Sequence, residues 1–236
     1  MPGWHALTAL CENQIFTIAA PMQNDETSSS HAEDGSSEPV AAPVRKRPKP
    51  GERRVQILQA LAAMLEQPGA ERVTTAALAA RLDVSEAALY RHFASKAQMF
   101  EGLIDFIEQS VFTLVNQITE RDIPGQEQAA RIVAMLMQFA EKNPGMTRVM
   151  VGDALVFENE RLQSRMNQFF DKIEATLRQA LRGVAAADGS ATPSVDAQVR
   201  ASSLTAFVVG RLQRFARSGF RRLPSEHLEA SVALML

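Results

Sequence analysis

Residues 74–96 read TTAALAARLDVSEAALYRHFASK, and this stretch limits the possible folds more than any other. Two short alanine-rich runs flank a Leu-Asp-Val turn, and Thr74 or Thr75 can cap the first run while Ser85 caps the second. Helices this short are marginal in water, so both must pack against another helix. The apolar residues available for that packing are Leu78, Leu82, Val84, Leu89 and Phe93. The pattern predicts a helix-turn-helix, although a helical hairpin with no role in DNA binding has the same spacing.

Apolar residues continue at helical spacing from Gly51 onward. A first helix carries Val55, Leu58, Leu61, Ala62 and Leu65 and ends at Pro68-Gly69. Later helices are expected over about 100–118, 131–142, 147–151, 154–182 and 195–218, and Ser225 is expected to cap a ninth. The prediction is an all-α fold of about nine helices. Residues 51–97 would form a three-helix DNA-binding domain, and 98–236 a helical dimerisation and regulatory domain.

The N-terminal segment differs from the rest in charge. Residues 1–44 hold six acidic residues and no Lys or Arg, which leaves 25 basic and 21 acidic residues in 45–236. Residues 1–50 are therefore expected to be a disordered acidic leader that ends in a basic arm. Arg47 and Lys49 in that arm can follow DNA phosphates, or the arm can be a solubilising linker. Translation could also start at Met22, which opens the polar part of the leader.

Several classes of protein are excluded by what the sequence lacks. It has no apolar run long enough to span a membrane, and its N-terminus has no basic flank typical of a signal peptide. One cysteine, Cys11, excludes an internal disulfide framework and fits a reducing cytoplasm. No motif for a phosphate-binding loop, a hydrolase nucleophile or a zinc site is present. We therefore expect no enzyme, no metal and no cofactor.

The second helix of the helix-turn-helix carries different kinds of side chain at its two ends. Ser85, Glu86 and Ala87 are small or short at the end that would enter the groove, so they would lie nearest the base edges. Hydroxyl, imidazole and cationic groups suit phosphate oxygens. The residues expected at phosphates are Thr74, Thr75, Tyr90, Arg91, His92 and Lys96.

Two further sets of apolar residues have alternative interpretations. The helix over 195–218 carries more apolar surface than one packing face requires, which predicts a dimer seam at Leu204, Phe207, Val208, Leu212 and Phe215. Five methionines could line a ligand pocket, but core filling is the favoured interpretation. They are Met135, Met137, Met146, Met150 and Met166.

The stretch VTTAALAARLDVSEAALYRHFASKAQMF resembles the DNA-binding domain of the TetR family of transcriptional regulators. Downstream blocks, among them FAEKNPGMTRVM and GRLQRFARSGFRR, are similar to the branch of that family that acts in nucleoid occlusion. The resemblance covers roughly residues 52–222. It implies a homodimer on palindromic double-stranded DNA in the cytoplasm at the nucleoid, and leaves open whether one or two dimers occupy a site.

The same resemblance implies a protein partner, the tubulin-like division protein FtsZ, and no small-molecule ligand. The acidic, partly apolar tail of FtsZ would dock on this protein near Phe106, Met135, Gln138, Lys142 and Asn143. Leu114 stands where an arginine would have added a charge contact. The alternatives are a ligand-responsive repressor of the TetR type and a helical interaction module that does not bind DNA.

Overall fold

The computed structural model describes residues 51–67 and 73–236, and within them every regular element is helical. This confirms the predicted all-α class with nine α-helices. The helices are α2 Glu52–Leu65, α3 Thr75–Arg81, α4 Glu86–Tyr90, α5 Lys96–Thr119, α6 Gly125–Lys142, α7 Pro144–Met150, α8 Glu160–Ala187, α9 Pro193–Arg217 and α10 Leu228–Met235, with a 3-10 turn η1 at Asp153–Leu155. Among these described helices none is long and apolar enough to cross a membrane.

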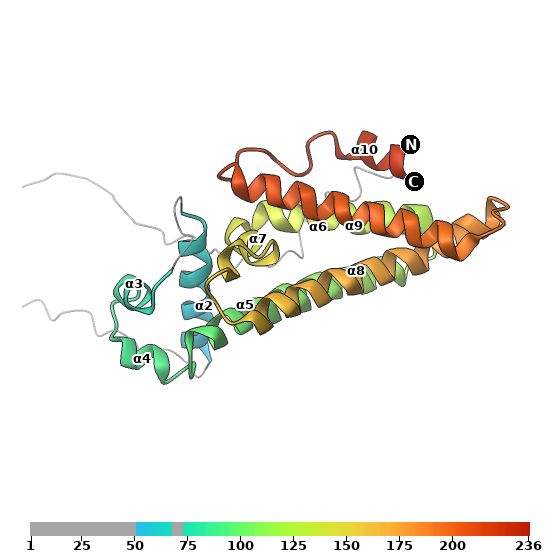
Figure 1. Ribbon diagram of the computed structural model, residues 1–236. Helices are drawn as coiled ribbons and strands as arrows, with labels where there is room; N and C mark the ends of the chain where they lie inside the picture. Colours follow the sequence, from blue (N-terminus) through green and yellow to red (C-terminus); the bar gives the residue numbers. More distant parts are fainter. Residues whose placement is uncertain (1–50, 68–72) are drawn as a thin grey trace, which may run out of the picture.

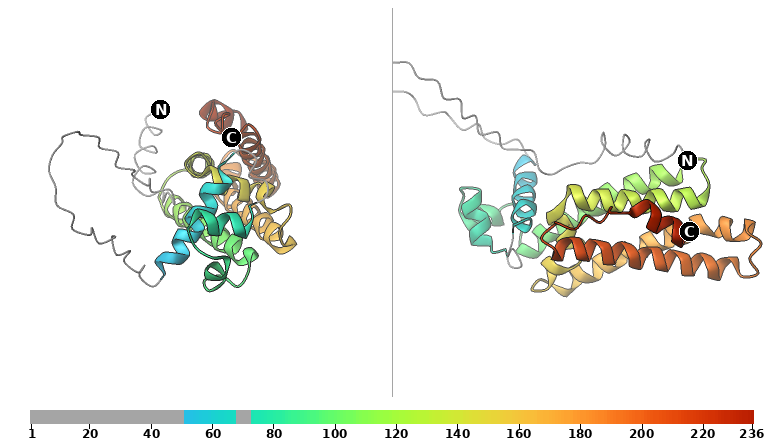
Figure 2. Two further views of the ribbon diagram at one scale, coloured as in Figure 1. Left: turned by 90° about the vertical axis from the view of Figure 1, so that its left-hand side faces the viewer. Right: turned by 90° about the horizontal axis from the view of Figure 1, so that it is seen from above.

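Helices α2, α3 and α4 form a small head at one end of the molecule, and α5, α6, α8 and α9 run lengthwise as an elongated bundle (Figure 1). The right-hand view of Figure 2 shows the same arrangement from above. The short helix α7 packs on α2 and on α9, so it lies where head and bundle meet. The C-terminal helix α10 packs along α9.

Local sequence signals account for the head. The Thr74 hydroxyl accepts a hydrogen bond from the Ala77 amide at 3.2 Å, and the Ser85 hydroxyl accepts one from the Ala88 amide at 3.3 Å. Both caps stand where the sequence predicts them. Asp83 adopts a left-handed φ of 53° in the turn between the two helices. Of the residues expected to hold the head together, Leu78, Leu89 and Phe93 are buried and Leu82 and Val84 are partly buried against the core.

The first helix turns most of its predicted face to the core: Leu61, Ala62 and Leu65 are buried and Leu58 is partly buried. Val55 is 52% exposed, whereas Ile57, outside the predicted stripe, is fully buried. In the bundle all five methionines of interest are buried, which confirms core filling; they are Met135, Met137, Met146, Met150 and Met166.

Several boundaries differ from the sequence prediction for physical reasons. Helix α6 begins at Gly125, six residues before the predicted Arg131. The missing side chain lets its first turn approach α8, since a Cβ on Gly125 would stand 2.0 Å from the Ala180 carbonyl oxygen. Helix α8 begins at Glu160 rather than near Ala154, which lies in η1. It then continues past Gly183 to Ala187, and Gly189 with a φ of +73° follows its end.

The predicted cap of the last helix is wrong. Ser225 does not cap α10, which begins three residues later after His227 in a left-handed conformation. The backbone amide of Ser225 instead donates a hydrogen bond to the Glu141 carboxylate of α6 at 2.9 Å. This bond ties the C-terminal segment to the bundle.

Candidate nucleic-acid interface

The N-terminal end of α4, which would enter the DNA groove, presents short and exposed side chains. Ser85, Glu86 and Ala87 are all exposed, and behind them Leu89 anchors the helix in the core of the head. Ser85 and Ala87 are small, and the longer Glu86 side chain is held by Thr75, so this end leaves room for a duplex to approach closely. The structure thus brings together the three residues predicted to lie nearest the base edges.

The predicted phosphate contacts fall into two groups. Thr74, Tyr90 and Arg91 are exposed, and Tyr90 keeps 45% of its surface accessible. Thr75 is partly buried, and its hydroxyl donates a 2.6 Å hydrogen bond to the Glu86 carboxylate, so it is engaged within the protein. This bond also joins α3 to the first turn of α4 and restrains the Glu86 side chain.

A clamp that the sequence analysis missed holds the far end of α4. Arg54 of α2 donates a hydrogen bond to the His92 carbonyl at 2.5 Å, and its guanidinium lies 4.2 Å from the centre of the Phe93 ring. A cation over an aromatic face is attracted by the ring quadrupole. His92 itself is partly buried. No pattern in the sequence signals this contact, because the partners lie 38 residues apart.

Lys96 requires a correction. Its ammonium forms an ion pair with Glu158, in the loop before α8, and lies 5.6 Å from the centre of the Phe100 ring. Only 26% of the Lys96 side chain is exposed. A phosphate contact would therefore require this pair to break. The two other basic residues predicted to follow DNA, Arg47 and Lys49, lie outside the described residues.

The predicted protein-binding residues are only partly at the surface. Met135 is 1% exposed and Asn143 is 4% exposed, and the Asn143 amide donates to the Phe139 carbonyl at 2.9 Å. These two residues belong to the bundle core and cannot form direct contacts with a docked peptide. Phe106 and Gln138 are partly buried. Lys142, at the end of α6, is exposed.

A surface groove lies beside Gln138. It runs between α6 and the C-terminal segment and has a volume of about 610 Å³. Its walls combine apolar and polar side chains, namely Ala134, Gln138, Ser225, His227, Leu228, Glu229, Ala230 and Ala233. A groove of this size and mixed lining can accept a short peptide.

The predicted dimer seam also needs correction. Leu204, Val208 and Leu212 are fully buried inside the single chain, and Phe215 is 2% exposed. Phe207 is partly buried and lies under the Arg211 guanidinium, at 4.9 Å. The large apolar residues that α9 exposes are Val195 and Val199, each 59% accessible. A partner contact through α9 would therefore have to use the opposite face of this helix.

Comparison with known proteins agrees with the geometry of the head and bundle. Residues 57–103 match a family described as "Bacterial regulatory proteins, tetR family", and residues 127–236 match an SlmA-like family described as "Tetracyclin repressor-like, C-terminal domain". A fatty acid degradation regulator, FadR from Bacillus halodurans, shares the fold with a TM-score of 0.63 at 14% identity, over 80% of this chain and 97% of that one.

Closer similarity is found among curated sequences. The nucleoid occlusion factor SlmA of Aliivibrio fischeri is 50% identical over 189 residues, which cover 80% of this chain and 96% of that protein. SlmA of Vibrio cholerae is 50% identical over 184 residues, covering 78% and 93% respectively. At this level of identity and coverage, the chain belongs to the SlmA nucleoid occlusion factors, a branch of the TetR family of helix-turn-helix regulators.

Proposed function

We propose that this protein is a DNA-bound nucleoid occlusion factor. As a homodimer it binds palindromic double-stranded DNA, and in that state it antagonises FtsZ assembly and so blocks septum formation over the nucleoid. The observation that carries the proposal is the N-terminus of α4, where the short side chains of residues 85–87 are exposed. It is supported by the 50% sequence identity with a relative named a nucleoid occlusion factor. The family assignment also argues against an enzyme, because its members are DNA-binding regulators.

A dimer is needed because a palindrome has two half-sites. The two copies of the head (α2–α4), which we call the reading heads, recognise these half-sites at a fixed separation. The exposed face of α9 supports a seam with a second copy. Val195, Val199 and Ala206 lie on that face at helical spacing, opposite the buried Leu204 and Val208. Gly210 follows on α9, and a Cβ added there would meet no atom within 4 Å. Glycine inside a helix costs about 1 kcal/mol relative to alanine, and close approach of a second α9 is a reason for it.

The tail of FtsZ fits the groove beside α6. An acidic, partly apolar peptide needs an apolar wall, an amide and a cation. Ala134 and Leu228 supply the apolar wall, Gln138 supplies the amide, and Lys142 lies exposed at the end of the same helix. Met135 and Asn143 contribute by holding α6 in place from inside.

The experiment that tests the proposal uses the full chain and FtsZ. Duplexes are first enriched from a random pool by binding to the protein, and the enriched sequences are read for palindromy. FtsZ assembly is then followed by light scattering with the protein alone, with the enriched duplex alone and with both. Loss of scattering only when both are present supports the proposal. An unchanged FtsZ signal in the presence of saturating duplex and protein would remove the FtsZ part, and absence of palindromes would remove the DNA part.

The peptide site has its own test. Lys142→Asp should reduce affinity for an FtsZ tail peptide at least about tenfold, because it replaces an attractive charge with a repulsive one. Affinity for the enriched duplex should stay within about twofold, since Lys142 lies beside Gln59 of α2 and Glu66 just after it, and not at the exposed N-terminus of α4. Arg182→Asp makes the same charge change at an exposed position of α8 and serves as the control. Normal peptide binding by Lys142→Asp would place the site elsewhere.

A further inference from the structure

Ion pairs join α5 to α8 and to the loop just before α8, in matching order along both segments. From the head end onward, within the described residues, Lys96 pairs with Glu158, Glu101 with Arg161 at 2.5 Å, and Asp105 and Glu108 with Arg165 at 2.6 Å each. The series continues as the edge-to-face contact of Phe112 with Phe169, at 5.5 Å between ring centres. Residue numbers rise together on both sides, so the two helices run in parallel. We refer to the ion pairs as the α5–α8 ladder.

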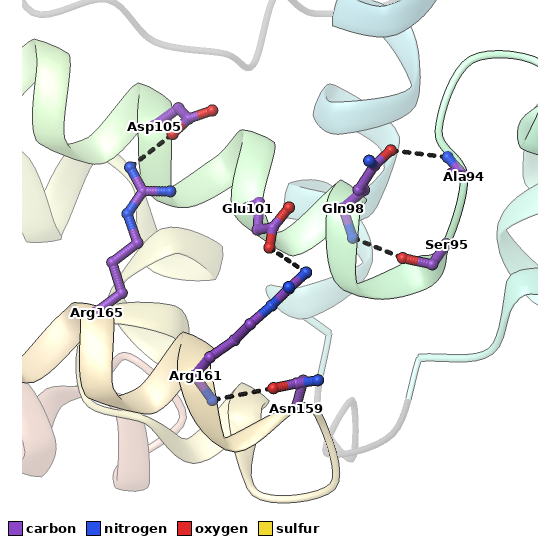
Figure 3. Close-up of polar contacts among 8 residues, drawn as sticks. All are labelled: Ala94, Ser95, Gln98, Glu101, Asp105, Asn159, Arg161 and Arg165. Atoms are coloured by element: carbon purple, nitrogen blue, oxygen red, sulfur yellow. Dashed lines mark hydrogen bonds and ion pairs between the residues drawn. The ribbon is translucent and has the colours of Figure 1, made fainter.

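Arg165 makes the last ion pairs of the ladder, and Figure 3 shows it beside Asp105. Its Nη2 contacts carboxylates from two positions one helical turn apart, Asp105 and Glu108, and its Nε donates to Glu108 at 3.3 Å. A planar guanidinium held by two carboxylates has a defined orientation, unlike the ammonium of a lysine. The Glu108 hydrogen bond raises the pKa of Arg165 further, so the charge is permanent. Arg165 therefore sets the position of α5 relative to α8 both along and around the helix axis.

The ladder acts on the helix that leads directly out of the reading head. Only five residues separate the end of α4 at Tyr90 from the start of α5 at Lys96. That connection is itself pinned: the Ser95 hydroxyl caps the Gln98 amide at 3.2 Å, and the Gln98 side chain accepts from the Ala94 amide at 2.8 Å (Figure 3). The direction of α5 is thus transmitted to α4.

A small change in that direction matters on the scale of DNA. With 24 residues, α5 is about 36 Å long. A tilt of about 5° displaces one end of such a rod by about 3 Å, which is close to the roughly 3.4 Å rise of one base pair. Because the two heads of a dimer would move in opposite directions, their separation changes by more than the shift of either head.

We propose that the α5–α8 ladder fixes the separation of the two reading heads and so determines which half-site spacing the protein accepts, with Arg165 as the main positioning residue. The inference rests on the proposed dimer on palindromic DNA. Helix α8 packs along α9, which carries the proposed seam, so α8 has a fixed place relative to the two-fold axis. The ladder then fixes the position of α5, and with it the head, relative to α8. Arg165 contacts no DNA itself.

A merely stabilising role would have a different consequence. Exposed ion pairs contribute little to stability, and losing one would weaken binding to every duplex alike. A positioning role changes the ranking of duplexes that differ only in the distance between identical half-sites. Spacing preference is therefore the measurement that separates the two roles.

The test compares full-chain variants on duplexes derived from the enriched palindrome, with the spacer unchanged or altered by one or two base pairs in either direction. The parent should prefer its own spacing at least about tenfold over a change of one base pair. Arg165→Met keeps the aliphatic stem, and should reduce that preference to about threefold or less. Glu101→Gln removes a separate rung and should act in the same direction.

Two controls complete the design. Arg178→Met changes an exposed arginine on the same helix that bonds to Gln198 of α9, and should keep the parental preference. The double exchange Glu108→Arg with Arg165→Glu reverses one rung and should restore part of the preference. Unchanged spacing preference in both Arg165→Met and Glu101→Gln, with normal folding by circular dichroism, would overturn the inference. A parent that selects no palindrome would instead refute the proposed function on which it rests.

Discussion

Gly145 of α7 lies so close to Ala62 of α2 that a Cβ on Gly145 would stand 2.1 Å from the Ala62 carbonyl oxygen. Real Cβ atoms do not approach an oxygen this closely, so only glycine allows the two backbones to touch. Helix α2 belongs to the reading head and α7 packs against the bundle, which makes this contact a joint between the two parts. The joint connects the head to the bundle directly, and the α5–α8 ladder connects it through α5, which also packs on α2.

Gly145→Ala is expected to destabilise the protein by about 1–3 kcal/mol, because the new methyl group must push α2 away from α7. The free energy of unfolding, measured with denaturant, checks the expectation. Gly183→Ala is the matched control, since a Cβ at that helical position meets no atom within 4 Å. It should leave stability unchanged or raise it by up to about 1 kcal/mol. Equal stability of the two variants would show that the joint can yield.

Glu66 lies at the same joint and gives it a dependence on pH. Burial raises the pKa of Glu66 from its usual 4.5, partly offset by a hydrogen bond with the Gly145 backbone and by the charge of Arg81. A carboxyl group with a raised folded-state pKa favours the folded state most when it is protonated. Its ionisation therefore lowers stability as the pH rises from the unfolded pKa through the folded one.

Glu66→Gln should accordingly be more stable than the parent at pH 7, where the parent carries the buried charge. The difference should shrink as the pH falls and disappear below about pH 4, where the parent carboxyl is neutral in both states. Denaturant unfolding of both proteins at several pH values measures this. A Glu66→Gln variant that is less stable at pH 7 would show that the Gly145 hydrogen bond outweighs burial.

The head could be predicted in detail from the sequence because its signals are local. The caps at Thr74 and Ser85 act over three residues, and each short helix has one leucine that anchors it in the core, Leu78 in α3 and Leu89 in α4. In α9, by contrast, the spacing of apolar residues does not distinguish a helix face that packs in the core from one that binds a partner. Leu204, Val208 and Leu212 are apolar in either case, and only their enclosure inside the bundle distinguishes the two.

The contacts of the charged residues could not be predicted for a related reason. Arg165 meets Asp105 and Glu108 across 60 and 57 residues, and Lys96 meets Glu158 across 62. Nothing in a single sequence brings such positions together. Lys96 follows α4 closely in sequence, and this position predicted a phosphate contact. In the fold, however, its ammonium forms an ion pair with Glu158.

The revised dimer seam predicts the effect of a charge on α9. Val199→Glu should produce monomers, because it places an unpaired carboxylate in the apolar centre of the proposed contact. Size-exclusion chromatography with light scattering measures the mass. The control is Val156→Glu, an equally exposed apolar residue at 63% that lies in the loop before α8, away from α9's outer face. A dimeric Val199→Glu protein would place the seam on another surface.

The last prediction concerns which basic residue of the head contacts phosphate. Arg91 is exposed at the end of α4, whereas the Lys96 ammonium is occupied by Glu158. Each phosphate contact contributes close to one unit to the slope of log affinity against log salt concentration. Arg91→Ala should therefore weaken binding to all duplexes and flatten this slope by about one unit. Lys96→Met should leave the slope nearly unchanged, because the lost charge was balanced within the protein. Fluorescence anisotropy over a series of salt concentrations distinguishes the two, and a flattened slope in Lys96→Met would mean that DNA displaces Glu158 from the lysine.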